Sequence, residues 1–123
     1  AASTITNQGL LPGPRIVNAV QDPSEGWNTL PKRQGNADAL PANTANQINI
    51  LLSVDNSPYW QVIAVTTTKN DKPITWFIAG TNTDWQGQPI AAVVVLESKA
   101  PQIAENIGRA LIEQAIRFTG QNP

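Results

Sequence analysis

Aromatic, β-branched and other apolar residues are most concentrated in the second half of the chain, and their grouping into runs predicts an antiparallel sheet over residues 59–97. Residues 59–68 are rich in aromatic and β-branched side chains, as strands are. A polar turn at 69–72 separates them from a second strand at 74–79, and so short a connection predicts a hairpin. Residues 90–96 are almost continuously apolar, which predicts a central strand covered on both faces.

A long amphipathic helix is predicted over residues 100–119. Pro101 lies near its start and Gly120 just beyond its end, which are positions that proline and glycine favour. Apolar residues recur through it at helical spacing, so we expect them to form the stripe that packs on the sheet. The residues of this expected stripe are Ala104, Ile107, Leu111, Ala115 and Phe118.

Residues 41–54 fit two patterns. Ile48, Ile50, Leu52 and Val54 alternate as in a strand, whereas Ala45, Ile48, Leu51 and Leu52 fall on one face of a helix. Pro41 at the front suits the first turn of a helix. The pattern therefore favours a helix without excluding a strand.

The first 40 residues are predicted to be rich in loops and to contain one hairpin. Residues 15–20 favour a strand, residues 21–26 a turn, and residues 27–30 the returning arm. Within the turn, Pro23 fixes φ and Gly26 can adopt a positive φ. The elements together predict one α+β domain over residues 1–123, in which an antiparallel sheet of three to five strands packs on the C-terminal helix.

Composition removes several classes of function. The net charge of −1 gives no electrostatic footprint for nucleic acid, so no nucleic-acid partner is expected. The chain has neither cysteine nor histidine, which excludes disulfides, thiol catalysis and Ser-His-Asp triads, and we expect no metal and no cofactor. No apolar run approaches the roughly 20 residues of a membrane helix, and the start does not resemble a signal peptide. We therefore expect no membrane contact by this segment.

The order of several weak motifs resembles the C-terminal part of the penicillin-binding transpeptidase domain. In that family a strand carries Lys-Thr-Gly-Thr, an Ala-Trp-Phe-like strand follows, and an apolar strand ending in Glu precedes a long helix. A helix end with an Asn-Gly turn and a further strand come earlier. The matching segments here are residues 1–9, 14–23, 65–68, 75–80, 90–97 and the helix from residue 100. The resemblance spans nearly the whole chain and implies a partial transpeptidase fold with a helix at 41–52.

The resemblance implies a degenerate substrate-binding strand at Val65, Thr66, Thr67 and Thr68. Val65 stands where the family has its lysine and Thr67 where it has glycine, so the positive charge and the space beside the strand are both lost. The family's Ser-x-x-Lys and Ser-x-Asn motifs do not occur at a fitting place. We therefore expect no catalytic residue in this chain.

The function that this resemblance implies belongs to a larger protein. The family cross-links peptidoglycan by acyl transfer to a serine, in the extracytoplasmic cell envelope, from proteins anchored in the membrane by a segment outside this one. The chain is then a non-catalytic C-terminal part whose partner is the rest of the domain. Peptidoglycan stem peptide or a β-lactam is the ligand of the parent.

Two other functions remain open from the residues alone. The first is a self-contained binding module of the cell envelope that recognises peptide or glycan through the sheet edge and an exposed Trp85. The second is a small hydrolase that uses Asp71, Asp84 or Glu97. An unpaired strand beginning at Tyr59 also leads us to expect a homodimer.

The remaining aromatic residues are assigned to packing. Adjacent strand residues point to opposite faces of a sheet, so at least one of Trp76 and Phe77 is expected in the core, and Phe77 is favoured. Trp27 and Trp60 are expected to pack against other parts of the chain.

Overall fold

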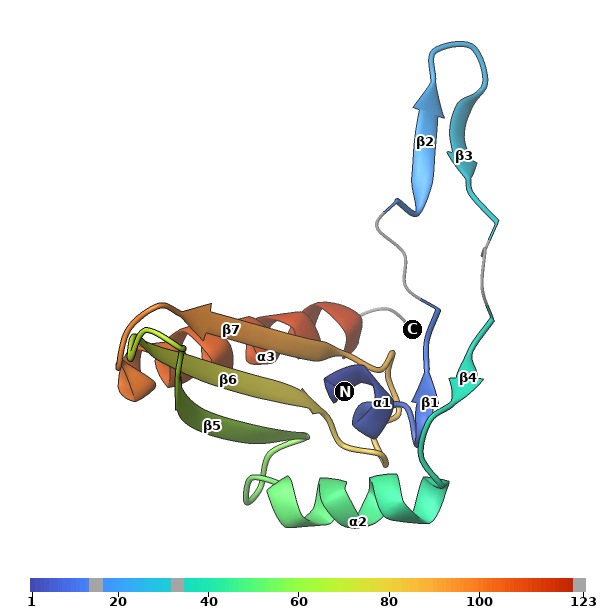
Figure 1. Cartoon of the computed structure of the whole chain (residues 1–123). Helices are drawn as coiled ribbons and strands as arrows, with labels where there is room; N and C mark the ends of the chain where they lie inside the picture. Colours follow the sequence, from blue (N-terminus) through green and yellow to red (C-terminus); the bar gives the residue numbers. More distant parts are fainter. Residues whose placement is uncertain (14–16, 32–34, 121–123) are drawn as a thin grey trace.

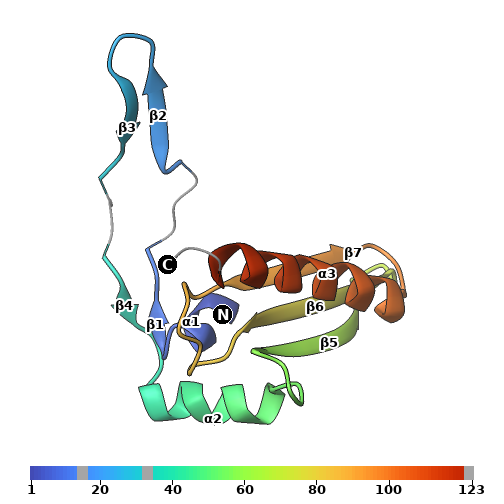
Figure 2. The same cartoon turned by 180° about the vertical axis from the view of Figure 1, so that it is seen from behind.

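The main sheet consists of β5 (Tyr59–Thr67), β6 (Pro73–Thr81) and β7 (Ala91–Leu96), and β6 is its central strand (Figure 1). The helix α3 (Pro101–Gly120) lies along one face of this sheet, which Figure 2 shows from behind. The computed structural model describes residues 1–13, 17–31 and 35–120. The arrangement confirms the predicted α+β class, the antiparallel sheet over 59–97 and the C-terminal helix.

Short elements make up the N-terminal part. The helix predicted at 41–54 is present, and the returning arm of the predicted hairpin is present as well. The first arm begins at Ala19, whereas the pattern predicted a strand from residue 15, and residues 15 and 16 lie outside the described part of the chain. In chain order the elements are α1 (Ala2–Thr6), β1 (Leu10–Leu11), β2 (Ala19–Asp22), β3 (Gly26–Thr29), β4 (Ala37–Asp38) and α2 (Ala42–Leu52).

The hairpin β2–β3 is held by its turn. The Asp22 carboxylate accepts hydrogen bonds from the Ser24 hydroxyl (2.5 Å), the Ser24 N–H (2.7 Å) and the Glu25 N–H (3.2 Å), which lower the pKa of Asp22 because they favour its charged form. Gly26 closes the turn with φ +81°. In Figure 1 the hairpin stands away from the sheet, and 70% of the Trp27 surface is exposed, so the expectation that Trp27 packs was wrong.

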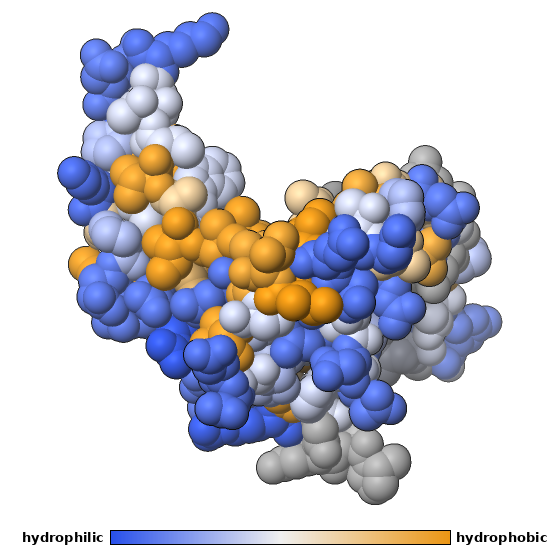
Figure 3. Space-filling model, turned by 90° about the horizontal axis from the view of Figure 1, so that it is seen from below, coloured by the Kyte–Doolittle hydropathy of each residue, from blue (hydrophilic) through white to orange (hydrophobic). Residues whose placement is uncertain are grey.

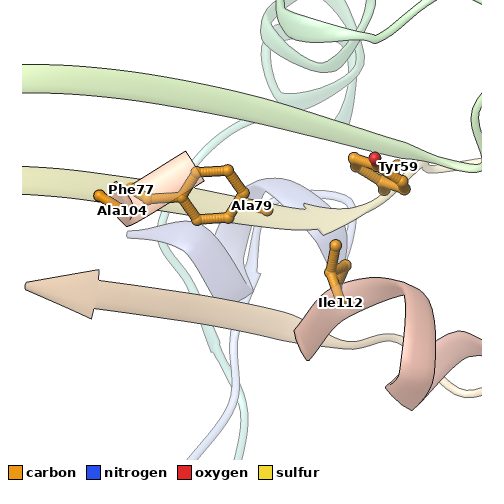
Figure 4. Close-up of a cluster of buried hydrophobic side chains, with 5 residues drawn as sticks. All are labelled: Tyr59, Phe77, Ala79, Ala104 and Ile112. Atoms are coloured by element: carbon orange, nitrogen blue, oxygen red, sulfur yellow. The ribbon is translucent and has the colours of Figure 1, made fainter. Parts of the chain in front are cut away.

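The core lies between α3 and the sheet. Tyr59, Phe77, Ala79, Ala104 and Ile112 form a buried cluster there, and Figure 4 shows their side chains gathered between helix and strands. Phe77 is fully buried, which confirms its predicted place in the core.

α3 packs tightly against the sheet at Gly108. A Cβ atom at this position would overlap the ring of Phe77, so the ring occupies the space that a side chain would otherwise fill. The helix therefore depends on glycine here for its distance from β6.

The buried side of α3 differs from the predicted stripe. Ala104 is buried as expected, but Ile107, Leu111 and Phe118 are exposed, with 52% of Leu111 accessible. The contact line instead follows Ala104, Gly108 and Ile112, because small residues at two of these positions let the helix approach the sheet. Apolar residues occupy two adjacent stripes of α3, and periodicity alone does not identify the one that packs.

Two further burial predictions were wrong for a related reason. β7 is an edge strand rather than a central one, and its side chains alternate between half-buried and exposed because α3 covers only one of its faces. In α2, Ala45 and Asn49 are buried, whereas Leu51 points outward. The apolar runs therefore predicted the strand β7 and the helix α2 correctly, but they did not predict which faces of these elements are buried.

The helix α1 is tied to the opposite face of the sheet. The indole N–H of Trp60 donates to the Thr6 hydroxyl (3.0 Å), and both side chains are buried. Gly80 lies beneath this pair, where a Cβ would meet the same two side chains. This confirms Trp60 as a packing residue and fixes α1 over one end of β6 and β7.

We predict that Gly108→Ala destabilises the protein although it raises helix propensity. Replacing glycine by alanine in a helix interior normally gains about 1 kcal/mol. The overlap with Phe77 reverses the sign, and we expect a net loss of about 1–3 kcal/mol in the free energy of unfolding, as in other overpacked cores. Urea unfolding measures it.

Leu111→Ala on the same helix is the matched control. Because Leu111 is half exposed, its truncation should cost well below the roughly 2–5 kcal/mol of a buried leucine. A Gly108→Ala protein more stable than the parent would contradict the packing described above.

Candidate functional site

The outer edge of β5 is the most accessible structured edge near the sequence-predicted site. β5 pairs with β6 along its full length, and at its start the other side meets Ser53 and Val54, through a bridge to Trp60 and a hydrogen bond to Tyr59. Within residues 1–13, 17–31 and 35–120, no further segment pairs with β5 between Gln61 and Thr67. This stretch is a free edge, and we call residues 61–67 the β5 edge.

The backbone groups that the β5 edge presents follow from the register. The hairpin is closed by a hydrogen bond from the Thr68 N–H to the Lys72 carbonyl (2.9 Å), so even-numbered residues of β5 bond toward β6. At the other end, the outward-facing carbonyl of Tyr59 accepts from Val54 N–H (3.3 Å). The alternation leaves the N–H and C=O groups of the odd-numbered residues facing outward. These residues are Gln61, Ile63, Val65 and Thr67.

The four sequence-predicted site residues lie together at the end of this edge, and all are exposed. The Thr66 hydroxyl accepts a hydrogen bond from the Trp76 indole N–H (2.9 Å), across the hairpin. The Thr68 hydroxyl accepts from the N–H groups of Asn70 (3.4 Å) and Lys72 (3.2 Å). Both hydroxyls therefore stabilise the hairpin and its turn, so recognition at this edge depends mainly on the backbone.

Sequence reasoning did not identify Gln61 and Ile63 as part of the edge. The motif comparison drew attention to residues 65–68 alone, whereas outward backbone groups extend four residues further toward the N-terminus. A usable signal was present, because residues 59–68 contain no charged side chain and no proline. Natural edge strands usually carry such residues to prevent pairing.

The chemistry available at the β5 edge is recognition of an extended chain. Val65 brings no positive charge, and 41% of its surface is exposed. The described residues hold no group of three or more acidic residues placed to bind a metal ion. Unpaired N–H and C=O groups in a row are the donors and acceptors that an added strand uses.

One face of the sheet near this edge is largely uncovered. Opposite residues in an antiparallel pair point to the same face, and the register places an apolar group on the side away from α3. The residues of this group, here called the open face, are Val62, Ala64, Trp76, Ile78, Val93 and Val95. Val93 on this face is 52% exposed. Apolar side chains also gather in a band on the underside of the molecule, where β5 and α2 lie (Figure 3).

Trp85 lies in a separate pocket of about 490 Å³. The prediction of an exposed indole was wrong in part, since Trp85 is half-buried and its N–H is covered and unpartnered. Its indole lies against Gly87, where a Cβ would overlap the ring. Ser57, Pro58, Asn82, Asp84, Gln86 and Thr119 line the rest of the pocket.

The three carboxylates considered for a hydrolase do not converge. Asp71 precedes β6, and Glu97 follows β7 at the same end of the sheet, because Leu96 pairs with Thr75. Asp84 follows the other end of β6, and a strand of this length separates the two ends by roughly 25 Å or more. No acid–base pair can include Asp84 with either of the others.

The described part of the chain contains no helix that is both long and apolar enough to span a membrane. Neither a protein-family model nor a curated protein matches the chain. A function has to be inferred from the free β5 edge, the open face and the Trp85 pocket.

Proposed function

We propose that the chain is the non-catalytic C-terminal part of a penicillin-binding transpeptidase domain, of the class that cross-links peptidoglycan in the extracytoplasmic cell envelope. Its contribution is structural. The sheet and α3 support the domain, and β5 forms one wall of the cleft in which stem peptide or β-lactam binds.

The open face is the observation that carries this proposal. A sheet that packs a helix on one side and leaves valine, isoleucine and tryptophan on the other buries only part of its apolar surface. Burial of such surface contributes about 25 cal/mol per Å², so covering the open face is favourable. Elements supplied by the rest of the domain are the partner expected here.

The β5 edge gives independent support. In the family, the strand that bears Lys-Thr-Gly-Thr borders the active-site cleft, and the threonines of this chain end a strand with one free edge. Val65 stands where the family has lysine and Thr67 where it has glycine. We therefore expect β5 to border the cleft as in the family but to contact the substrate more weakly. The parent's acylation depends on residues outside this chain.

We predict that the isolated chain is not labelled by fluorescent penicillin. No serine here has a lysine three residues after it, so the nucleophile and its activating amine are missing. Gel fluorescence, with an active transpeptidase as the positive control, should give no band at 13.2 kDa. A labelled band at that mass would contradict the assignment of the chain as non-catalytic.

We further predict that Val93→Lys has little effect on the isolated chain but impairs the full-length product of its gene. In the isolated chain position 93 is half exposed, so the free energy of unfolding, measured in urea, should change by no more than about 0.5 kcal/mol. In the full-length protein the lysine is buried without a partner, and penicillin labelling should fall severalfold.

Gln47→Lys, at an exposed polar position of α2, is the control and should leave labelling unchanged. Equal labelling of the Val93→Lys and unmodified full-length proteins would overturn the proposal, as would full-length protein that penicillin never labels.

The Trp85 pocket favours a second candidate, a self-contained cell-envelope module that binds peptide or glycan. An indole beside Pro58, with the Asp84 carboxylate and the Ser57 hydroxyl nearby, offers an apolar wall and hydrogen-bonding groups to a sugar. This function needs no further elements over the open face.

The second candidate predicts that the N-acetylglucosamine–N-acetylmuramic acid disaccharide changes the tryptophan fluorescence of the isolated chain. Trp85→Ala should abolish the change, and Trp27→Ala on the exposed hairpin should preserve it. Titration without any change, at up to about 10 mM sugar, would exclude the pocket as a glycan site.

A further inference from the structure

We infer that the β5 edge pairs with the β5 edge of a second copy of this chain, so that two sheets join into one across a twofold axis. The inference does not rest on the proposed function, because it requires only a free edge. Three properties of the edge carry it: its unpaired backbone groups, its lack of protecting side chains, and its complementarity to itself.

The unpaired groups supply the attraction. Gln61, Ile63, Val65 and Thr67 present their N–H and C=O groups outward, as the register with β6 and the closing bond at Thr68 require. Such a row is a template for another strand. When a second strand pairs, backbone hydrogen bonds to water are replaced by hydrogen bonds between the strands. The exposed apolar side chains of both edges are buried at the same time, which is favourable.

The edge lacks the features that normally prevent pairing. Natural edge strands are blunted by lysine, proline, bulges or short length. β5 is nine residues long and has an unbroken register with β6. Along the chain, the nearest charged side chains are Lys69, Asp71 and Lys72 in the turn beyond the strand. From α3, Glu105 reaches only the start of the edge, where its carboxylate accepts a hydrogen bond from the Gln61 side-chain amide (3.4 Å).

Symmetry selects one register. An antiparallel pair of identical strands is isologous, so residue i opposes residue j in both directions. The register with residue 64 on the twofold axis gives partners to the largest number of outward groups, and it sets residue 61 opposite 67 and residue 63 opposite 65 of the other copy. Ala64 then faces its own counterpart in a non-hydrogen-bonded pair, where Cα atoms are about 4.5 Å apart.

The side chains accept this register. Ile63 lies opposite Val65 on the face that bears α3, and Val62 lies opposite Thr66 on the open face. β-branched residues pair favourably across strands, and no like charges meet. Ala64 is exposed and small, which lets the two backbones approach at the axis. The pairing also joins the two open faces into one longer apolar surface.

The Ser53–Trp60 bridge marks where the pairing ends. Ser53 occupies the outer side of β5 at Trp60, and the geometry of this bridge turns the Gln61 N–H toward the Leu52 carbonyl, so the edge is fully open from Val62 onward. The Gln61 carbonyl stays available to the symmetric register. The dimer therefore needs no opening of the α2–β5 connection.

A single introduced cysteine tests the register, because the chain has none of its own. Ala64→Cys places two thiols at the axis within the range of a disulfide. Thr66→Cys is the control, since it is at least as accessible but lies four residues from its counterpart, about 14 Å away. Under mild oxidation at micromolar protein, we expect the Ala64→Cys dimer to form at least about tenfold faster on a non-reducing gel.

The unmodified chain tests the association itself. Light scattering across a concentration series should approach twice the 13.2 kDa mass of one chain. Val65→Pro removes an outward N–H without touching the ladder to β6, a position where edge strands tolerate proline, and should shift the equilibrium to monomer. Val65→Ala keeps the N–H and should remain dimeric, and circular dichroism checks that both variants are folded.

Three results would overturn the inference. The first is a monomer mass for the unmodified chain up to about 1 mM, which is far above the concentration a specific pair requires. The second is equal cross-linking rates at positions 64 and 66, which would show random collision. The third is a dimer whose Ala64→Cys variant does not cross-link, which would place the interface elsewhere. If Val65→Pro does not fold, the cysteine pair alone decides.

Discussion

The fold depends on the close approach of α3 to β6, where the ring of Phe77 occupies the space left by Gly108. This contact sets the distance between helix and sheet, and the buried cluster of Tyr59, Ala79, Ala104 and Ile112 is built around it. Small residues on the helix and a large ring on the strand make the two surfaces complementary, as close-packed interiors require. The same contact rotates α3 so that Ile107 and Leu111 turn toward solvent.

One helix on one face leaves the other face and the outer edges of β5 and β7 available. α1 covers only the end of the sheet where Trp60 bonds to Thr6. The open face offers apolar area, and the β5 edge offers backbone hydrogen bonds, so they suit different partners. The open face fits helices or strands from the rest of a domain, whereas the edge fits a single extended strand.

The proposed transpeptidase origin and the inferred pairing concern different states of the same surface. In the proposed transpeptidase domain β5 borders a cleft, with an extended ligand or another element beside it. In the isolated chain nothing among the described residues fills that place, and a second copy is the strand present at the highest concentration. Val65 stands where the proposed family has lysine, and this matters to both states, because the charge that is absent would oppose strand pairing and would also attract a carboxylate.

The sequence by itself determined the identity of the regular elements. β-branched density specified β5 and β6, the turn at Lys69–Lys72 specified their hairpin, and the spacing of apolar residues specified α3. These signals are local, since each depends on residues within a few positions of one another.

Tertiary structure alone decided which sides of these elements are covered. The side of α3 that packs depends on Gly108 meeting Phe77, which lies 31 residues away. Residues 90–96 carried enough apolar character for a central strand, yet the strand lies at an edge because no fourth strand is described beyond it. The outward groups of Gln61 and Ile63 follow from the register with β6. Burial and edge exposure are properties of contacts between distant segments, which a local pattern does not encode.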